Sequence, residues 1–327
     1  MNKDVRESLA IGIDLGGTNL RVGVVNHRGI ILNSLKHPTL AHEGKDKVID
    51  RIADLLEEAL ETSKTSSKEI RGICIGAPGF LDIRRGLIRE SPNLSGWKDV
   101  ALKDEITKRT SLTSVFLQND ANVYTFGEWW KGAGNGYNSI VGITLGTGVG
   151  GGLILDKKIW SGEDGMAGEI GHMIVEPSGL RCKCGRSGCL ESYSSGTAII
   201  RRTIMALKRG ENSSLKEKIK GDFNVITPKM VFEEAQGGDG LSREMLTDAG
   251  RYLGIAISSL MNILNVRRFV IGGRVAGAGD IILQPAMQEV RKRAINVPEE
   301  EKCIVQATLG DDAGIIGAAG VVLQGEK

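Results

Sequence analysis

The stretch LAIGIDLGGTNLRVGVVN, residues 9–26, decides the fold. Apolar and β-branched residues run up to the glycine pair Gly16 and Gly17 and resume after it, which predicts two antiparallel strands joined by a tight turn. The stretch GIILNSLK, residues 29–36, predicts a third strand that extends the same antiparallel meander. The sheet has to bury its apolar face, so a helix is expected next along the chain.

Helices and strands alternate after this meander. Strands are predicted at residues 70–80 and 114–122, and an amphipathic helix at residues 102–111 separates them. Residues 46–63 predict a helix that covers one face of the sheet, because their apolar side chains recur at helical spacing: Val48, Ile52, Leu55, Leu56 and Ala59. This alternation indicates an α/β organisation for the first 120 residues.

The second half of the chain starts again with strands at residues 138–159. A helix is predicted at residues 227–236, with Thr227 as its N-cap and a proline in its first turn. Residues 242–264 predict a long, mostly buried helix. Small residues recur at helical spacing in residues 311–324, which suits a helix that packs closely against its neighbours.

The two halves share a sequence echo. The stretches IGIDLGGT, residues 11–18, and VGITLGTG, residues 141–148, align at a constant offset. They share the pairs Gly12/Gly142, Ile13/Ile143, Leu15/Leu145 and Gly16/Gly146. A strand, a glycine turn and a returning strand, repeated once per half, indicate two related domains. Chance similarity between two glycine hairpins is the alternative.

Both glycine turns are suited to an anion, because glycine lets main-chain N–H groups approach closely and adopts positive φ freely. Phosphate is the obvious candidate. Neither turn continues into the Lys-Ser/Thr of a P-loop, and neither opens a helix as the dinucleotide-binding fingerprint requires. The sequence therefore disfavours a P-loop or nicotinamide-binding protein.

Charge and hydropathy argue against nucleic acid and membrane as partners. The formal net charge is +2, and basic residues are interspersed with acidic ones. No apolar run approaches the roughly 18 residues of a membrane span, and the start MNKDVRESLA lacks the apolar core of a signal peptide. We therefore expect a cytoplasmic protein.

The stretch GHMIVEPSGLRCKCGRSGC, residues 171–189, gathers three of the five cysteines behind one of the four histidines. Thiolates from Cys182, Cys184 and Cys189 with the imidazole of His172 make a Cys₃His set, a common closed shell for structural zinc. A disulfide, a redox thiol pair and unlinked cysteines are the alternatives. Four protein ligands leave no open position, so the metal would be structural. The other two cysteines, Cys74 and Cys303, lie in strand-like apolar runs and are expected to be buried.

Several motifs now carry a family resemblance. DLGGTNLR, LGTGVGGG and IGGRVAGAG look like the phosphate and adenosine segments of the actin, chaperone and sugar-kinase superfamily. GAPG, ESPNLSGW, QNDAN, GMAGEIGH and CKCGRSGCLESYSSG resemble, in order, the motifs of the ROK family, from about residue 10 to the end.

The resemblance implies a two-lobed, duplicated α/β fold of the actin-like (ribonuclease H-like) type with a zinc-binding loop at residues 172–191. It implies a small domain of residues 1–122, joined by a C-terminal helix at residues 312–327, and a large domain of residues 123–311.

The function that the resemblance implies is ATP-dependent phosphorylation of a hexose. ESPNLSGWKDVAL with GMAGEIGH looks most like glucokinases, so glucose, phosphorylated at the 6-hydroxyl, is the expected substrate. N-acetylmannosamine, fructose, mannose and allose are alternatives. A sugar-sensing transcriptional regulator is a further one, but only about ten residues precede IGIDLGG, too few for a helix-turn-helix. Homodimers or homotetramers are a family expectation.

The resemblance also assigns site residues. It makes Asp120 the catalytic base, although an Asp or Asn at this point also looks like a helix N-cap. It assigns to the sugar Gly79, Asn93, Asn119, Asp120, Glu169, His172 and Glu191. It assigns to ATP Gly16, Gly17, Thr18, Gly146, Thr147, Gly148, Gly272 and Gly273, with Asp14 orienting Mg²⁺. A solvated surface charge is the alternative for Glu169 and Glu191, and a buried core histidine is the alternative for His172. Arg274 departs from the small residue expected after the glycine pair.

Overall fold

The structure is a computed structural model that describes residues 8–297 and 302–325. The chain divides into two compact units. The first unit takes in Met1–Gly142, Gly152–Gly168 and Thr308–Lys327, and the second takes in Ile143–Gly151 and Glu169–Ala307. The functional boundaries predicted near residues 122 and 311 stay a prediction.

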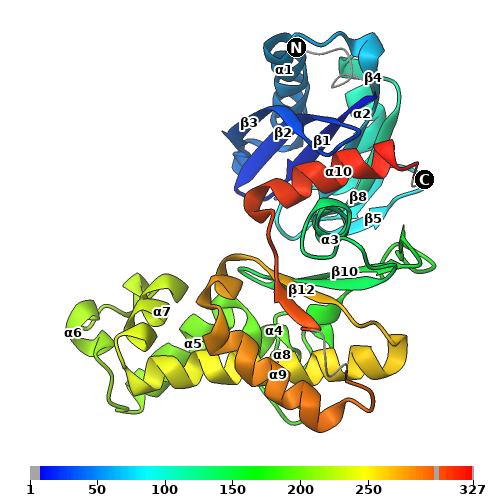
Figure 1. Ribbon diagram of the computed structural model, residues 1–327. Coiled ribbons are helices and arrows are strands. Elements are labelled where there is room, and N and C mark those ends of the chain that lie inside the picture. Colours follow the sequence, from blue (N-terminus) through cyan, green and yellow to red (C-terminus); the bar gives the residue numbers. More distant parts are fainter. Residues whose placement is uncertain (1–7, 298–301, 326–327) are drawn as a thin grey trace. The chain divides into compact units, whose positions relative to one another are not determined.

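A five-stranded sheet forms the centre of the first unit (Figure 1), in the order β3-β2-β1-β4-β8. Its strands are β1 (Leu9–Leu15), β2 (Asn19–Asn26), β3 (Ile31–Pro38), β4 (Ile70–Ala77) and β8 (Val115–Asn119). Strand β2 pairs antiparallel with β1 and β3, so the predicted meander is confirmed. Strand β4 pairs parallel with β1 and β8, which aligns the carboxyl ends of these three strands.

Helices cover both faces of this sheet. Helix α1 (Lys45–Ser63), as predicted, packs the apolar stripe through Ile52 against alternate residues of β1 such as Ile11. Helix α10 (Ala313–Leu323) packs on the opposite face, where Ala10 lies against Ile315. A Cβ on Gly12 would lie 2.0 Å from the Ile315 carbonyl oxygen, so only glycine allows so close an approach. The other helices of the unit are α2 (Leu102–Arg109) and α3 (Asp120–Lys131).

A small antiparallel sheet in the first unit was not predicted. It has the order β5-β6-β7, with strands β5 (Phe80–Asp82), β6 (Leu87–Glu90) and β7 (Lys98–Val100). Strands of three or four residues are too short to show a hydrophobic period. The unit also has short 3₁₀ turns, namely η2 (Ala41–Glu43), η3 (Ser67–Glu69) and η7 (Gly310–Asp312).

A second five-stranded sheet repeats the strand order of the first, as β11-β10-β9-β12-β13. Its strands are β9 (Ile140–Leu145), β10 (Val149–Leu155), β11 (Lys158–Ile159), β12 (Phe269–Gly272) and β13 (Ile304–Gln306). Strands β9 and β1 occupy the same central place, and they contain Gly142 and Gly12 of the sequence echo. The predicted α/β duplication is therefore confirmed, and chance similarity is excluded.

Apart from β12 and β13, the regular elements described within residues 169–307 of the second unit are helical. Its helices are α4 (Glu191–Ser194), α5 (Gly196–Lys208), α6 (Leu215–Ile219), α7 (Pro228–Gln236), α8 (Gly240–Leu264) and α9 (Asp280–Arg293). Its 3₁₀ turns are η4 (Ile170–His172), η5 (Phe223–Val225) and η6 (Arg274–Ala278). Thr227 caps α7 as predicted, because its hydroxyl accepts the Met230 N–H at 3.2 Å. The long buried helix begins at Gly240, two residues earlier than predicted. None of the described helices is long and apolar enough to span a bilayer.

Candidate active site and metal centre

Acidic side chains gather in the first unit at the carboxyl edge of its sheet. Asp14 lies near the end of β1, and Asp120 follows the end of β8 as the first residue of α3. Parallel strands end at one edge of a sheet, and that edge is where α/β proteins place their ligands. Asp14 also lies directly opposite Arg21 of the antiparallel partner strand β2.

The surroundings of Asp14 disfavour the charged form of its carboxyl group. Its pKa is raised from 3.8 to about 6, mainly by burial; the negative charges of Asp120 and Asp311 contribute to the rise, and Arg21 opposes it. Like charges in a desolvated place favour a bound cation, and Mg²⁺ takes carboxylate oxygens while keeping several waters. The donor set at this edge therefore fits Mg²⁺.

The beginning of α10 closes this edge within the first unit. Arg21 donates to the Asp312 carboxylate at 2.7 Å and to the carbonyl of Asp311. A Cβ on Gly314 would lie 3.0 Å from the Asp14 carboxylate, so the first turn of α10 contacts this group directly. Sequence reasoning missed Asp311. Its only signal was an acidic pair immediately before the small-residue helix.

The cap of α3 is Asn119. Its Oδ1 accepts the N–H groups of Ala121 at 2.9 Å and Asn122 at 3.2 Å, while Asp120 Oδ1 also accepts from Ala121 at 2.8 Å. The capping alternative considered for this motif thus holds for Asn119. A capping carboxamide keeps both N–H donors of its Nδ2, so the predicted sugar contact by Asn119 is compatible with capping. The role of Asp120 as the base stays a prediction.

Thr39 fixes the first glycine turn through two hydrogen bonds. The Gly16 N–H donates to the Asn19 carbonyl at 2.9 Å, which closes the turn. The Thr39 hydroxyl donates to the Gly16 carbonyl at 2.6 Å, and its N–H donates to the Thr18 carbonyl at 2.9 Å. Carbonyl oxygens that would repel phosphate are therefore already bonded on the turn.

Close backbone contacts require glycine at two places near the predicted sugar-contact residues. A Cβ on Gly17 would lie 2.7 Å from the Asn93 carbonyl oxygen, so the ESPNLSGW loop rests on the glycine turn. Gly79 has φ of 111°, and a Cβ there would lie 2.2 Å from the Glu90 carbonyl oxygen. The structure thus brings Asn93 and Gly17 together within the first unit.

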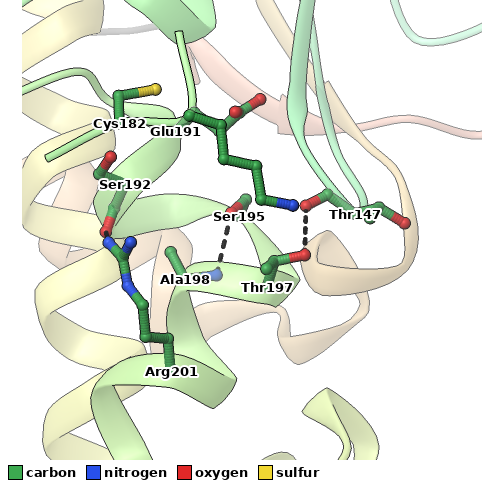
Figure 2. Close-up of a pocket in the computed structure, with 9 residues that line it drawn as sticks. Thr147, Cys182, Glu191, Ser192, Ser195, Thr197, Ala198 and Arg201 are labelled. Atoms are coloured by element: carbon green, nitrogen blue, oxygen red, sulfur yellow. Dashed lines mark hydrogen bonds between the residues drawn. The ribbon is translucent and has the colours of Figure 1, made fainter. Parts of the chain in front are cut away.

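The second glycine turn is held by the start of helix α5 (Figure 2). The Gly196 N–H donates to the Gly146 carbonyl at 2.8 Å, and the Thr197 hydroxyl donates to the Thr147 carbonyl at 2.8 Å. On this turn too, the carbonyl oxygens of Gly146 and Thr147 already accept hydrogen bonds. Gly273, at φ 83°, would place a Cβ 2.4 Å from the Leu145 carbonyl oxygen, so the predicted adenosine segment lies beside this turn.

Glu191 also contacts the second turn. Its Oε2 accepts the Val149 N–H at 3.0 Å, and a Cβ on Gly148 would lie 2.5 Å from the same oxygen. Glu169 and His172 lie at the two ends of turn η4, where the His172 N–H donates to the Glu169 carbonyl at 3.0 Å. Both side chains are exposed, so His172 is not a core histidine.

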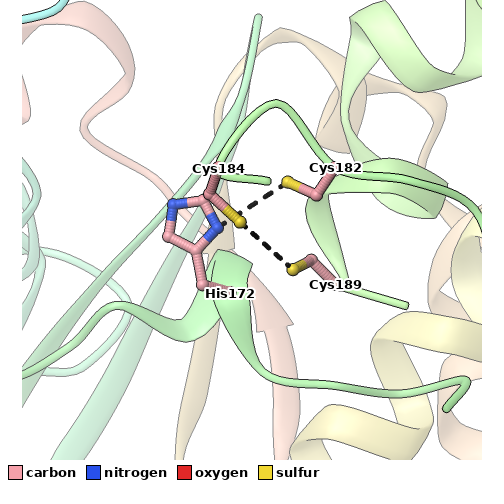
Figure 3. A group of neighbouring side chains, drawn as sticks. All are labelled: His172, Cys182, Cys184 and Cys189. Atoms are coloured by element: carbon pink, nitrogen blue, oxygen red, sulfur yellow. Dashed lines mark hydrogen bonds between the residues drawn. The ribbon is translucent and has the colours of Figure 1, made fainter. Parts of the chain in front are cut away.

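The three thiols and the imidazole come together as predicted (Figure 3). The Sγ of Cys182 lies 3.9 Å from His172 Nδ1, and the Sγ atoms of Cys184 and Cys189 lie 3.6 Å apart. All four ligand atoms lie within 4.8 Å of one another, and the cysteines are free. A tetrahedral Zn²⁺ with bonds of about 2.3 Å to sulfur and 2.0 Å to nitrogen separates its ligands by about 3.5 to 3.8 Å. The set therefore fits zinc.

Hydrogen bonding and burial act in opposite directions on these thiols. The backbone N–H of Arg186 is the main cause that lowers the pKa of Cys184 to about 7, whereas burial raises the pKa of Cys189 to about 12. A metal ion binds only the thiolate form and so has to displace the Cys189 proton. As predicted, Cys74 and Cys303 are fully buried elsewhere.

The paired sheets, the glycine turns and the Cys₃His cluster define the class: a duplicated α/β protein with the sugar-kinase fold. The chain belongs to the ROK family, whose sequence profile matches residues 10–325. The resemblance is therefore confirmed.

Three relatives show the breadth of the family. A glucokinase from Halalkalibacterium halodurans is 39% identical over 97% of this chain and 96% of its own. The crystal structure of a ROK family glucokinase from Streptomyces griseus in complex with glucose and AMPPNP has a TM-score of 0.80 at 34% identity, covering 97% of this chain and 99% of that one. A putative xylose repressor from a Caldicellulosiruptor species is 30% identical over 99% of this chain and 79% of its own.

Proposed function

We propose that this protein is an ATP-dependent glucokinase, which transfers the γ-phosphoryl group of ATP to the 6-hydroxyl of glucose. The observation that carries the proposal is the carboxylate group of the first unit, where Asp120 and Asp14 lie at one sheet edge beside a glycine turn. The glucokinase from Halalkalibacterium halodurans, similar over nearly its whole length, supports the same activity.

In this mechanism Asp120 accepts the proton of the 6-hydroxyl as it attacks phosphorus. A positioned base contributes about 10² to 10⁴ in rate. Asn119 donates from its Nδ2 to a neighbouring sugar hydroxyl, since its Oδ1 is engaged in capping α3. Asp14 would hold Mg²⁺, which would neutralise charge on the phosphates. The turn of Gly16, Gly17 and Thr18 takes donor phosphate, and within it the Gly16 N–H is already bonded to the Asn19 carbonyl.

Residues of the second unit complete the assignment. In the second unit, Glu169, His172 and Glu191 are the residues assigned to sugar hydroxyls; in the first unit, they are Gly79 and Asn93. Gly146, Thr147 and Gly148 take donor phosphates, and Gly272 and Gly273 take the adenosine. His172, through Nδ1, and the three cysteines would hold zinc, and the imidazole would then keep its proton on Nε2 and offer it to the sugar.

A coupled assay of ADP release tests the substrate. We expect kcat/KM for glucose to exceed that for N-acetylmannosamine, fructose, mannose and allose. A higher kcat/KM for any of these would replace glucose. Sugar binding without turnover would favour a sugar-sensing regulator, the activity class suggested by the xylose repressor relative.

The variant Asp120→Asn tests the base. Because Asn119 provides the cap, the variant should fold normally and lose at least about 100-fold in kcat. The matched control is Asp104→Asn, which makes the same change in the first turn of α2. Equal kcat in the two variants would assign the base elsewhere.

We further infer a cytoplasmic enzyme of carbohydrate metabolism that forms a homodimer or homotetramer. Free thiols suited to zinc favour a reducing compartment. Light scattering of the purified protein measures the assembly, and a monomeric mass would reject it.

A further inference from the structure

A pocket in the second unit joins the cysteine cluster to the second glycine turn (Figure 2). Its wall includes Thr147 of the turn, Cys182 and Lys183 of the metal loop, Glu191, and Thr197 and Arg201 of helix α5. The residues come from three separate parts of the sequence. The metal loop therefore borders the donor side of the site as well as carrying the sugar ligand His172.

The pocket has uncompensated positive charge. Among the described residues, Arg201 donates only to backbone carbonyls, those of Arg181 at 3.3 Å and Ser192 at 3.4 Å. Within residues 8–297 and 302–325, neither Arg201 nor Lys183 has a carboxylate partner in a salt bridge. The single acidic residue of the wall, Glu191, directs Oε2 at the Val149 N–H. Two cations thus face one engaged carboxylate.

The start of helix α5 adds to this charge. The helix has 13 residues, and its first turn holds Thr197 in the pocket wall. The N-terminus of a helix carries partial positive charge and favours anions. Thr197 also bonds to Thr147, so the helix end and the glycine turn form one surface of the pocket.

We propose that this pocket binds a phosphate group of the donor, with Lys183 and Arg201 as its cations. The inference rests on the proposed function and deepens it. Hexose hydroxyls are recognised by several acceptors, whereas phosphate oxygens are recognised by cations and amides, and two cations beside a glycine turn match phosphate. Lys183 lies between Cys182 and Cys184, so a metal held by these thiols would also fix the position of this cation.

The variant Lys183→Ala tests this inference. We expect KM for ATP to rise about tenfold, with kcat and KM for glucose within about twofold of the wild type, because a charge-assisted contact is lost. Added KCl should shrink the difference by screening. The matched control is Arg186→Ala, which removes one positive charge from the same loop outside the pocket wall. The control should keep KM for ATP unchanged.

Two results would overturn the inference. One is a KM for ATP that is the same in both variants. The other is a rise in KM for glucose as large as that for ATP with loss of bound metal, because Lys183 would then act on the loop itself.

Calorimetric titration with inorganic phosphate separates this pocket from the proposed function, since it needs no turnover. Phosphate that binds the wild type, is displaced by a non-hydrolysable ATP analogue and is lost in Lys183→Ala supports the pocket, even if glucose is not the substrate. Phosphate that the analogue does not displace would assign the pocket to a separate phosphate ligand and overturn the donor role.

Discussion

Replacing Asp14 by asparagine should make the protein more stable and inactive. Asp14 holds a charge in a partly buried place beside the like charges of Asp120 and Asp311, with Arg21 as the opposing charge. The asparagine side chain would keep the shape of the aspartate and remove its charge. We expect this carboxylate to hold a cation, and its charge destabilises the folded state.

The pKa of Asp14 sets the size of the effect. In the folded protein this pKa is raised from 3.8 to about 6, so the folded state binds more protons than the unfolded state between these values. Stability therefore falls as pH rises through this window, and the charge is most costly above it. This rise of about two pKa units lowers the free energy of unfolding by at most about 3 kcal/mol at pH 8 and by at most about half of that at pH 5. The values are upper limits because the group is partly exposed.

Urea unfolding followed by tryptophan fluorescence is the assay. All four tryptophans (Trp97, Trp129, Trp130 and Trp160) lie in the first unit, the unit of Asp14, so the signal reports that unit alone. The measurement needs Mg²⁺-free buffer. We expect Asp14→Asn to gain about 1 to 3 kcal/mol at pH 8 and a smaller amount at pH 5. The control, Asp54→Asn, changes an exposed aspartate of α1.

A variant that is no more stable than the wild type at pH 8 would refute the reasoning. So would a gain of the same size at pH 5 and pH 8, because a titrating charge cannot produce it. Full activity of Asp14→Asn with Mg²⁺ and ATP would show that this carboxylate does not bind the metal. The prediction about the pKa of Asp14 and the stability of the protein would still hold.

Three further predictions concern structural contacts. Elemental analysis should find one zinc per chain. The variant Cys189→Ser should lose this zinc and should melt at a lower temperature when followed by far-UV circular dichroism. A variant with the metal content of the wild type would contradict the Cys₃His assignment. Gly17→Ala should destabilise the first unit by about 1 to 3 kcal/mol because its Cβ meets the Asn93 carbonyl, and an unchanged urea midpoint would show that this loop yields freely. The carboxylate of the fully buried Glu128 accepts hydrogen bonds from the N–H groups of Ala133, Thr308 and Leu309. Glu128→Ala should therefore lower the free energy of unfolding by at least about 3 kcal/mol, and Glu128→Gln should lower it by less. Equal losses of stability in the two variants would contradict a hydrogen-bonding role.

Local patterns in the sequence were sufficient for the strands and for the metal loop. Gly12 and Gly142 lie in strands that show clear β-rich runs on both sides of a glycine turn. The cysteines lie within eight positions of one another, so their meeting required no long-range folding information. Such features depend on neighbours in the chain.

Contacts between distant segments were not predictable from patterns. Asp311 approaches Asp14 only because α10 returns to the first sheet. Glu128 resembles an ordinary helical residue in the sequence, and nothing local indicates that its carboxylate caps the backbone at Thr308. In the sequence Lys183 is only a spacer between two metal ligands, since its place in a pocket beside Thr147 depends on how helix α5 packs.

Helix α10 has a consequence for how the protein is made. Ala10 and Val25 of the first sheet are covered by Ile315 and Ala319, which the ribosome adds long after the strands they cover. That apolar face stays bare while the chain is synthesised, and exposed strands of this kind attract chaperones and aggregate. The uninterrupted stretch from Glu169 to Ala307 has no such delay. We therefore expect the first unit, although its strands are synthesised first, to complete its folding only after α10 has been made.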